Sequence, residues 1–205
     1  MIKEFFLALI GIYRNPNKYF EEKKSNNKIL KLAILYSGVI YTVRRISSVI
    51  TKGRFDDVEL YQKSINSWPV FWVFVVIIGL LACGLIYYFG GFIFRIFIRL
   101  SKGSYTSKEE VRETNILLSL VCSFPASLYL LGVSFFYKSF LYFYYNDLFF
   151  SYLYICLLIM VNIYKYKVAR SKYKTTKIPS VIFFLIISNI LNVFGLLVLI
   201  MGTLA

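Results

Sequence analysis

The 33 residues from Trp68 to Leu100, "WPVFWVFVVIIGLLACGLIYYFGGFIFRIFIRL", carry no acidic side chain and no charge before Arg95. About 20 consecutive apolar residues are enough for a helix to cross a bilayer, so this stretch predicts a transmembrane span. Trp68 and Trp72 suit the aromatic belt at one membrane interface. At the other end, Arg95 and Arg99 lie four residues apart on one helix face, where both side chains can reach the lipid headgroups.

The composition of the whole chain is typical of a polytopic membrane protein. Of its 205 residues, 59% are hydrophobic and only 17% are charged, and long uncharged blocks alternate with short basic ones. A soluble domain of this length needs a more polar surface. We therefore expect the net charge of +14 to face anionic lipid headgroups rather than nucleic acid.

The sequence offers little material for catalysis. It contains no histidine, and its three cysteines lie inside apolar blocks without the spacing of a metal site. We find no paired carboxylates, Walker motif or nucleophile elbow. The prediction is a non-enzymatic protein without catalytic residues, cofactor or metal.

A glycine pair, Gly90 and Gly91, lies within the long apolar stretch. A phosphate-binding loop places its glycines after a strand and at the start of a helix. Here the pair lies inside an apolar helix, where small residues let two helices approach closely. We expect the pair to mark a helix-packing site.

The apolar blocks of the whole chain predict an all-α fold with five transmembrane helices and a short N-terminal interfacial helix. Residues 1–28 form a cytoplasmic amphipathic segment, and residues 29–205 form the transmembrane domain. The first span is the least regular, since ending it at Val43 leaves it too short, and extending it to Ile50 includes Arg44 and Arg45. The expected spans are about 29–50, 69–98, 115–136, 148–164 and 179–201.

Arg44 and Arg45 have two interpretations. They could bind an anionic lipid, pair with Asp56 or Asp57, or contact an acidic group of a partner. Alternatively, they only reach the outer interface from a short, tilted helix.

Two groups of polar residues fall inside the predicted spans, and Pro125 is expected to kink the third span. Each group could line a polar groove for a ligand or partner, or form hydrogen bonds between helices, and we favour the second interpretation. Asparagines in hydrocarbon need partners, so the two groups are expected to face each other. The groups are Asn115, Ser119, Ser123 and Ser127 in the third span, and Ser188, Asn189 and Asn192 in the fifth.

The distribution of lysines and arginines predicts the orientation in the membrane, and a capping box predicts the start of the third helix. Seventeen lysines and arginines fall in segments that are inside if the N-terminus is cytoplasmic, against six in the outer loops. This asymmetry favours a cytoplasmic N-terminus and an extracytoplasmic C-terminus. Ser107 with Glu110 forms a capping box at the start of a helix, and Thr106 with Glu109 is the alternative register.

Three segments resemble the Yip (Ypt-interacting-protein-like) family, specifically its bacterial branch. They are "NPNKYFEE" (15–22), "FGGFIFRIFIRLSKGSY" (89–105) and "SKEEVRETNILLSLVCSFP" (107–125), and the resemblance covers about residues 14–200. The family often has a glycine pair near Ser101 and Lys102, where this chain keeps only Gly103. The acidic and glycine-tyrosine signatures of the eukaryotic branch are absent, so a small-GTPase partner is not expected.

The resemblance implies a non-enzymatic protein of a bacterial cell membrane. Some bacterial relatives accompany ABC-type exporters as accessory subunits and are linked to toxin or peptide resistance. The first hypothesis is therefore a scaffold or accessory subunit, with anionic lipids and other membrane-protein subunits as partners and a homo-oligomer as a further option. The alternatives are a small-solute or lipid channel or carrier that uses the polar faces of spans three and five, and a membrane-shaping protein. No acid lies well inside a predicted span, which disfavours a proton-coupled carrier.

Overall fold

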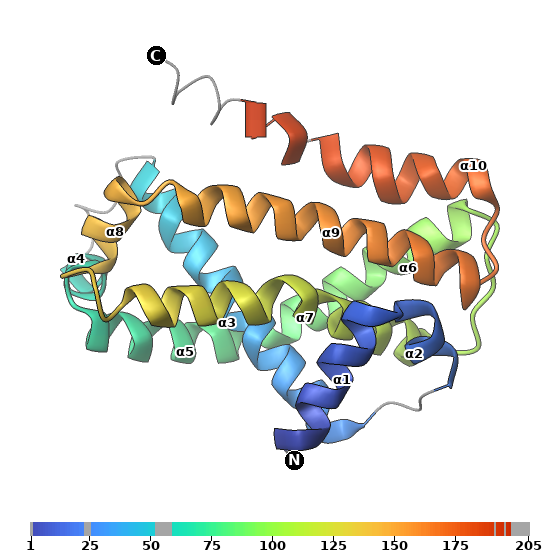
Figure 1. The fold of residues 1–205 in the computed structure, drawn as a ribbon, viewed down its shortest axis with the longest axis horizontal. Helices are drawn as coiled ribbons and strands as arrows, with labels where there is room; N and C mark the ends of the chain where they lie inside the picture. Colours follow the sequence, from blue (N-terminus) through green and yellow to red (C-terminus); the bar gives the residue numbers. More distant parts are fainter. Residues whose placement is uncertain (1, 23–25, 52–58, 191, 195, 198–205) are drawn as a thin grey trace.

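The computed structural model describes residues 2–22, 26–51, 59–190, 192–194 and 196–197 (Figure 1). All regular secondary structure in these ranges is helical, which confirms the predicted all-α class. The elements are α1 (Ile2–Arg14), α2 (Pro16–Glu22), α3 (Asn27–Thr51), α4 (Glu59–Asn66), α5 (Trp68–Leu85), the π-helix η1 (Ile86–Gly90), α6 (Gly91–Leu100), α7 (Lys108–Val133), α8 (Phe140–Asn146), α9 (Phe149–Ser171), α10 (Lys177–Ser180) and the π-helix η2 (Val181–Ile187).

Four helical stretches of the described chain are long and apolar enough to cross a membrane. They match the predicted second to fifth spans and cover Trp68–Leu100, Lys108–Val133, Phe149–Ser171 and Lys177–Phe194. The predicted first span is a 25-residue helix, α3, but it is not among the four. Lys31, Arg44 and Arg45 interrupt its apolar run. The chain is thus a helical protein with membrane-compatible spans, and a fifth crossing by α3 stays a prediction.

The bundle has two distinct ends (Figure 1). Helices α7 and α9 run side by side along the long axis. Helices α4 and α8 lie together at one end of the bundle, and we call the end formed by these two helices the aromatic end. The connections 101–107 and 172–176 lie at the opposite, basic end. Helix α3 crosses the bundle obliquely, packs mainly on α5 and α7, and ends beside α8, where the hydroxyls of Thr51 and Tyr144 are 2.6 Å apart.

Two helix boundaries differ from the prediction. The third span begins at Lys108, because the Ser107 side chain accepts the backbone N–H of Glu110 at 3.0 Å, which confirms the first capping register. It ends at Val133 rather than at residue 136. The fourth helix continues to Ser171, past the predicted end at residue 164, so the basic residues Lys165, Lys167 and Arg170 are helical. Lysine and arginine are good helix formers and are stabilised near a helix C-terminus, which explains the extension.

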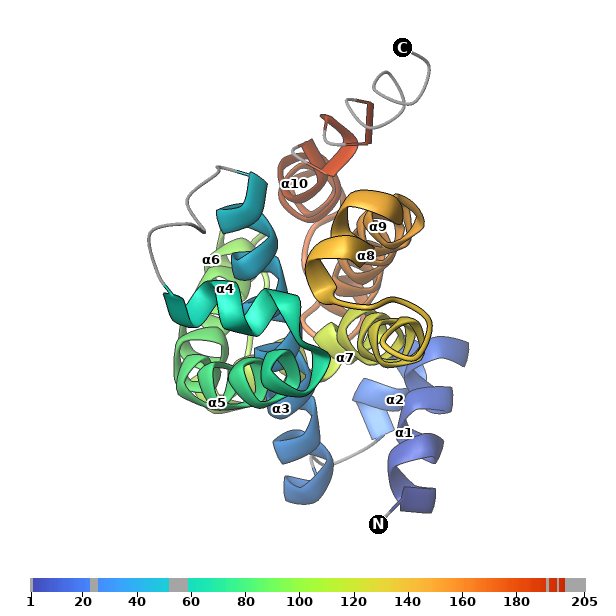
Figure 2. The same cartoon turned by 90° about the vertical axis from the view of Figure 1, so that its left-hand side faces the viewer.

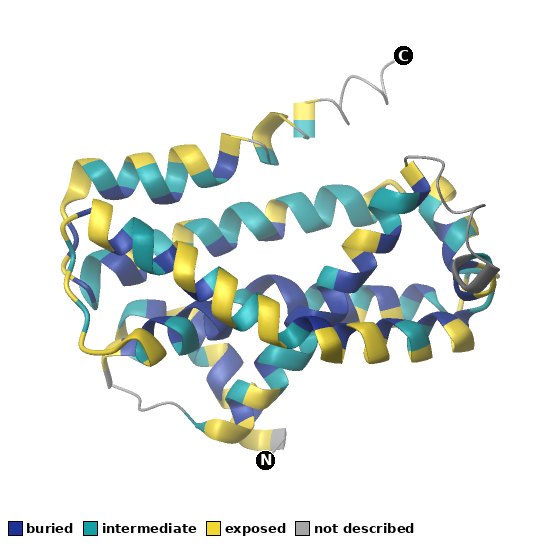
Figure 3. Ribbon diagram, turned by 180° about the vertical axis from the view of Figure 1, so that it is seen from behind, coloured by how far each residue is buried: buried dark blue, intermediate teal, exposed yellow. Residues whose placement is uncertain are grey.

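The buried core follows α7, whereas the outward faces of the other spans are apolar and exposed (Figure 3). Leu81 and Leu85 on α5, and Ile178 and Ile190 in the last helix, are all more than half exposed. Such faces would be unfavourable in water and suit lipid hydrocarbon.

The N-terminal helix α1 forms as predicted, but it docks on the bundle. Its Phe5 ring stacks on Tyr36 of α3, with centroids 5.9 Å apart, and meets Phe124 of α7 edge-on at 5.4 Å. Figure 2 shows α1 and α2 beside α7, and α2 also packs against α9. Phe6 and Leu7 stay exposed, so α1 is apolar on both faces and can contact lipid while packed on the protein.

Candidate functional site

Helices α3 and α5 cross backbone against backbone at two glycines that were not among the predicted packing residues. A Cβ atom added at Gly38 of α3 would lie 2.5 Å from the carbonyl oxygen of Gly79 on α5. A Cβ at Gly79 would lie 3.0 Å from the carbonyl carbon of Gly38. Both positions therefore need glycine, and isolated glycines on two helices gave no sequence signal comparable to a glycine pair.

The predicted packing role of Gly90 and Gly91 agrees with their surroundings. A Cβ at Gly91 would lie 2.4 Å from Cγ of Arg112, and one at Gly90 would lie 2.9 Å from Nδ2 of Asn115. Because both partners belong to α7, the pair sets how closely η1 and α6 approach α7. Asn115 is buried, and its Oδ1 finds no hydrogen-bond partner among the described residues.

The polar stripe of α7 faces α3 and η1, not the fifth span. The Ser119 hydroxyl lies 2.5 Å from that of Ser37 on α3. Ser123 and Ser127 are buried, and neither hydroxyl has a hydrogen-bond partner within the described chain.

The polar patch of the fifth span pairs with α9 instead, which corrects the prediction that the two patches face each other. Asn162 Nδ2 donates to Asn189 Oδ1 at 2.9 Å and to the Ser188 carbonyl at 3.2 Å. Asn192 Nδ2 donates to the same Ser188 carbonyl at 3.3 Å. Helix α9 packs against both α7 and η2 and so separates the two patches. The partner Asn162 was missed because it belongs to no polar stripe at helical spacing in its span.

Pro125 creates a docking point for α1. A proline lacks the N–H that would bond to the carbonyl four residues earlier, which here belongs to Val121. The Tyr13 hydroxyl of α1 donates to that carbonyl at 2.7 Å. The Tyr164 hydroxyl of α9 then donates to the Tyr13 carbonyl at 2.9 Å. Burial raises the pKa of Tyr13 to about 12, so its hydroxyl stays a donor at neutral pH.

Arg44 and Arg45 are exposed and contact aromatic rings. The Arg44 guanidinium lies 5.2 Å from the centroid of Tyr154 on α9. Arg45 donates from Nε to the Tyr41 hydroxyl at 3.0 Å. Their proposed partners Asp56 and Asp57 lie outside the described residues. The two arginines are thus partly held by cation–π contacts, and each still exposes its charge.

The predicted interface residues divide into two kinds. Trp68 is only 7% exposed and donates from Nε1 to the Tyr137 carbonyl at 2.7 Å, so it anchors the aromatic end and is not a lipid-facing belt residue. The packing of α8 over the start of α5 explains this burial. Trp72 is half-buried, whereas Arg95 and Arg99 contact the rings of Phe92 and Tyr105 near the basic end.

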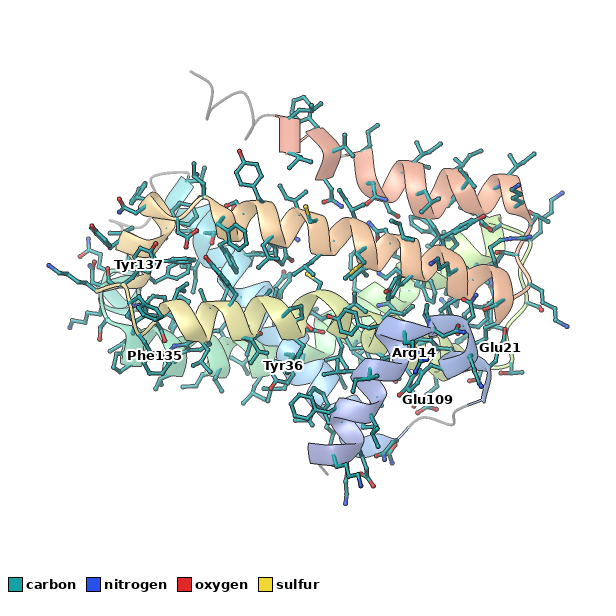
Figure 4. The ribbon with its side chains drawn as sticks, in the orientation of Figure 1. Arg14, Glu21, Tyr36, Glu109, Phe135 and Tyr137 are labelled. Atoms are coloured by element: carbon teal, nitrogen blue, oxygen red, sulfur yellow. The ribbon has the colours of Figure 1, made fainter. Side chains whose placement is uncertain are left out.

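Trp72 and Ser127 line an apolar groove of about 180 Å³ between α3, α5 and α7. Neither the indole Nε1 nor the Ser127 hydroxyl has a hydrogen-bond partner among the described residues. Figure 4 labels Tyr36, which also lines this groove, on α3.

The basic end holds a network of polar side chains around a cavity of about 240 Å³. Lys172 Nζ lies 2.9 Å from Glu110 Oε1 and 3.3 Å from the Thr114 hydroxyl, which also accepts the Tyr173 hydroxyl at 3.0 Å. Backbone bonds join the two connections, from Ser104 N–H to the Tyr173 carbonyl at 3.0 Å. This network clamps α7 to the end of α9.

The end of α6 departs from the usual helix terminus. Lys102 follows the helix with φ 57, the left-handed conformation that glycine adopts most easily. This is the region where the Yip family often has a glycine pair. Gly103 comes one residue later, and its N–H donates to the Ile98 carbonyl at 2.9 Å.

Taken together, these side chains form helix-packing contacts, hydrogen bonds and cation–π contacts. No group of three or more metal-ligand side chains occurs among the described residues. Compared with known proteins, the chain matches no family model, no curated protein and no solved structure. The Yip resemblance therefore stays a prediction.

Proposed function

We propose that the chain is a non-enzymatic scaffold or accessory subunit of a larger complex in a bacterial cell membrane. In this proposal α3 is the first of five spans, the N-terminus is cytoplasmic, and the complex is an ABC-type exporter of toxins or peptides. The exporter rests on the Yip resemblance alone. The scaffold role rests on the packing of the bundle.

One observation supports the scaffold role: two polar pairs within the spans form hydrogen bonds that join neighbouring helices. Ser119 pairs with Ser37, and Asn162 pairs with Asn189. The outward faces are large, apolar and exposed, as suits contact with lipid or with other transmembrane helices.

The test is affinity purification from the native membrane in mild detergent after light crosslinking, read by mass spectrometry. Stoichiometric recovery of exporter subunits supports the proposal. Recovery of the protein alone, together with unchanged exporter assembly and activity after its deletion, removes it.

A second candidate function, a small-solute or lipid conduit, is favoured by Ser123 and Ser127, whose buried hydroxyls have no hydrogen-bond partner among the described residues. Replacing Ser119 and Ser123 with alanine separates the two functions. A conduit reconstituted in vesicles loses flux in this variant. A scaffold loses at most some stability, because the substitutions remove only the hydrogen bonds of Ser119 to the Ser37 hydroxyl and to the Ile116 carbonyl.

A further inference from the structure

A groove of about 410 Å³ opens on the outer face of α5, η1 and α6, where the first turn of α7 meets them. Its lining is aromatic and aliphatic except for one cation: Gly84, Leu85, Tyr88, Phe89, Phe92 and Arg112. All of the lining except Arg112 is exposed in this structure. A π-helical turn, η1, supplies the middle of the lining, and such turns are frequent at functional sites.

Arg112 is built into this groove by the glycine pair. The aliphatic part of its side chain passes over Gly91 of α6. A Cβ at Gly91 would lie 2.9 Å from the Arg112 Cα, so only glycine permits this approach of α6 to α7. Its guanidinium then lies 4.5 Å from the centroid of the Tyr88 ring. No carboxylate of the described residues forms an ion pair with it.

This geometry leaves Arg112 able to bind a phosphate. A guanidinium that stacks its face on a ring keeps its N–H edge free for two parallel hydrogen bonds to an oxyanion. Arg112 begins one turn into α7, at the basic end, which is the headgroup level in the proposed orientation. From Gly84 to Phe92 the lining extends about 12 Å along the helix axis, enough to support much of an acyl chain.

We propose that this groove binds an anionic phospholipid, with its phosphate on Arg112 and one acyl chain along Tyr88, Phe89 and Gly84. The charge of Arg112 selects an anionic headgroup over a zwitterionic one, and the apolar lining selects a lipid over a free phosphate. The inference rests on the membrane location in the proposed function, but not on any partner subunit.

The experiment uses the full chain in mild detergent with equal amounts of phosphatidylglycerol and phosphatidylcholine of the same acyl chains, read by native mass spectrometry. The unaltered protein is expected to retain phosphatidylglycerol preferentially. Arg112→Gln is expected to lower that preference about fivefold, the effect of one cation near a charged headgroup. Equal retention of the two lipids by the unaltered protein overturns the inference.

Two matched glycine variants keep the test independent of Arg112. A Cβ at Gly84 or at Gly132 meets nothing within 4 Å, so a side chain can be introduced at both sites without a clash at its first atom. Gly84→Leu fills the groove and is expected to reduce lipid retention, whereas Gly132→Leu lies outside the groove and is expected to leave it unchanged. Equal retention by the two variants contradicts the proposed site.

Two further experiments distinguish a failure of the lipid proposal from a failure of the proposed membrane location. Glycerol phosphate at the same concentration is expected not to displace the lipid, and displacement would assign the site to a free phosphate and overturn the lipid proposal. Fractionation of cells shows whether the chain is in the membrane at all. Absence from the membrane removes the proposed function, whereas a membrane-bound chain without lipid preference removes only this site.

Discussion

Tyr13→Phe tests how the N-terminal helix is held. The substitution removes one hydroxyl and keeps the ring, so only the 2.7 Å bond to the Val121 carbonyl is lost. Because Pro125 has no N–H to replace it, that carbonyl is left without its helical donor. An unsatisfied buried acceptor costs about 1–3 kcal/mol, and individual hydrogen bonds inside membrane proteins contribute from about 0.6 to about 1.7 kcal/mol. We expect a loss of about 1.5 kcal/mol, roughly tenfold in the unfolding equilibrium.

The assay is an SDS titration of the detergent-purified protein, followed by the fluorescence of Trp68 and Trp72. Tyr145→Phe on α8, an exposed tyrosine, is the control and is expected to change stability little. Pro125→Ala restores an N–H four residues after Val121. In that background Tyr13→Phe should cost about 0.5 kcal/mol or less, which gives a coupling energy of about 1 kcal/mol. Equal costs in the two backgrounds would refute the role assigned to the proline.

The pH dependence of stability provides a second test of the hydrogen bond between Tyr13 and the Val121 carbonyl. Burial raises the pKa of Tyr13 from its ordinary value of 10.0 to about 12. The folded state therefore holds this proton more tightly, and the resulting stability is complete below pH 10 and lost as pH rises toward 12. The stability difference between the unaltered protein and Tyr13→Phe should narrow over that window, and a difference that is constant up to pH 12 would contradict this.

Three further substitutions test individual contacts by the same titration. Gly38→Ala forces a methyl group against a backbone carbonyl and should destabilise by about 1–3 kcal/mol, whereas Gly132→Ala, with open space around it, should be neutral or slightly stabilising. Asn162→Leu should cost about 1 kcal/mol, and less when Asn189 is also replaced by leucine, because no unpaired amide then remains. Lys102→Gly should stabilise by about 1 kcal/mol, since glycine adopts a φ of 57 without strain, and a destabilised variant would contradict that reading.

The helices were predictable from the apolar runs of the sequence, because the thickness of the bilayer's hydrocarbon core sets the length of a transmembrane helix. The capping register at Ser107 followed from local hydrogen-bonding chemistry in the same way. The packing partners were not predictable, because they depend on which helices are neighbours. Asn162 and the Gly38–Gly79 crossing are single residues whose importance appears only when two helices cross. The role of Tyr13 was hidden for the same reason, since 108 residues of sequence separate it from Val121.

The most direct test of the account is the side of the membrane on which each terminus lies. If α3 crosses the bilayer, the chain has five spans and its termini lie on opposite sides. The measurement uses a variant whose three cysteines are replaced by serine, with one cysteine introduced at Lys3 or appended after Ala205. A membrane-impermeant thiol reagent is then applied to intact cells. We expect labelling at the C-terminus and none at position 3, and the same outcome at both positions would mean that α3 does not span the membrane.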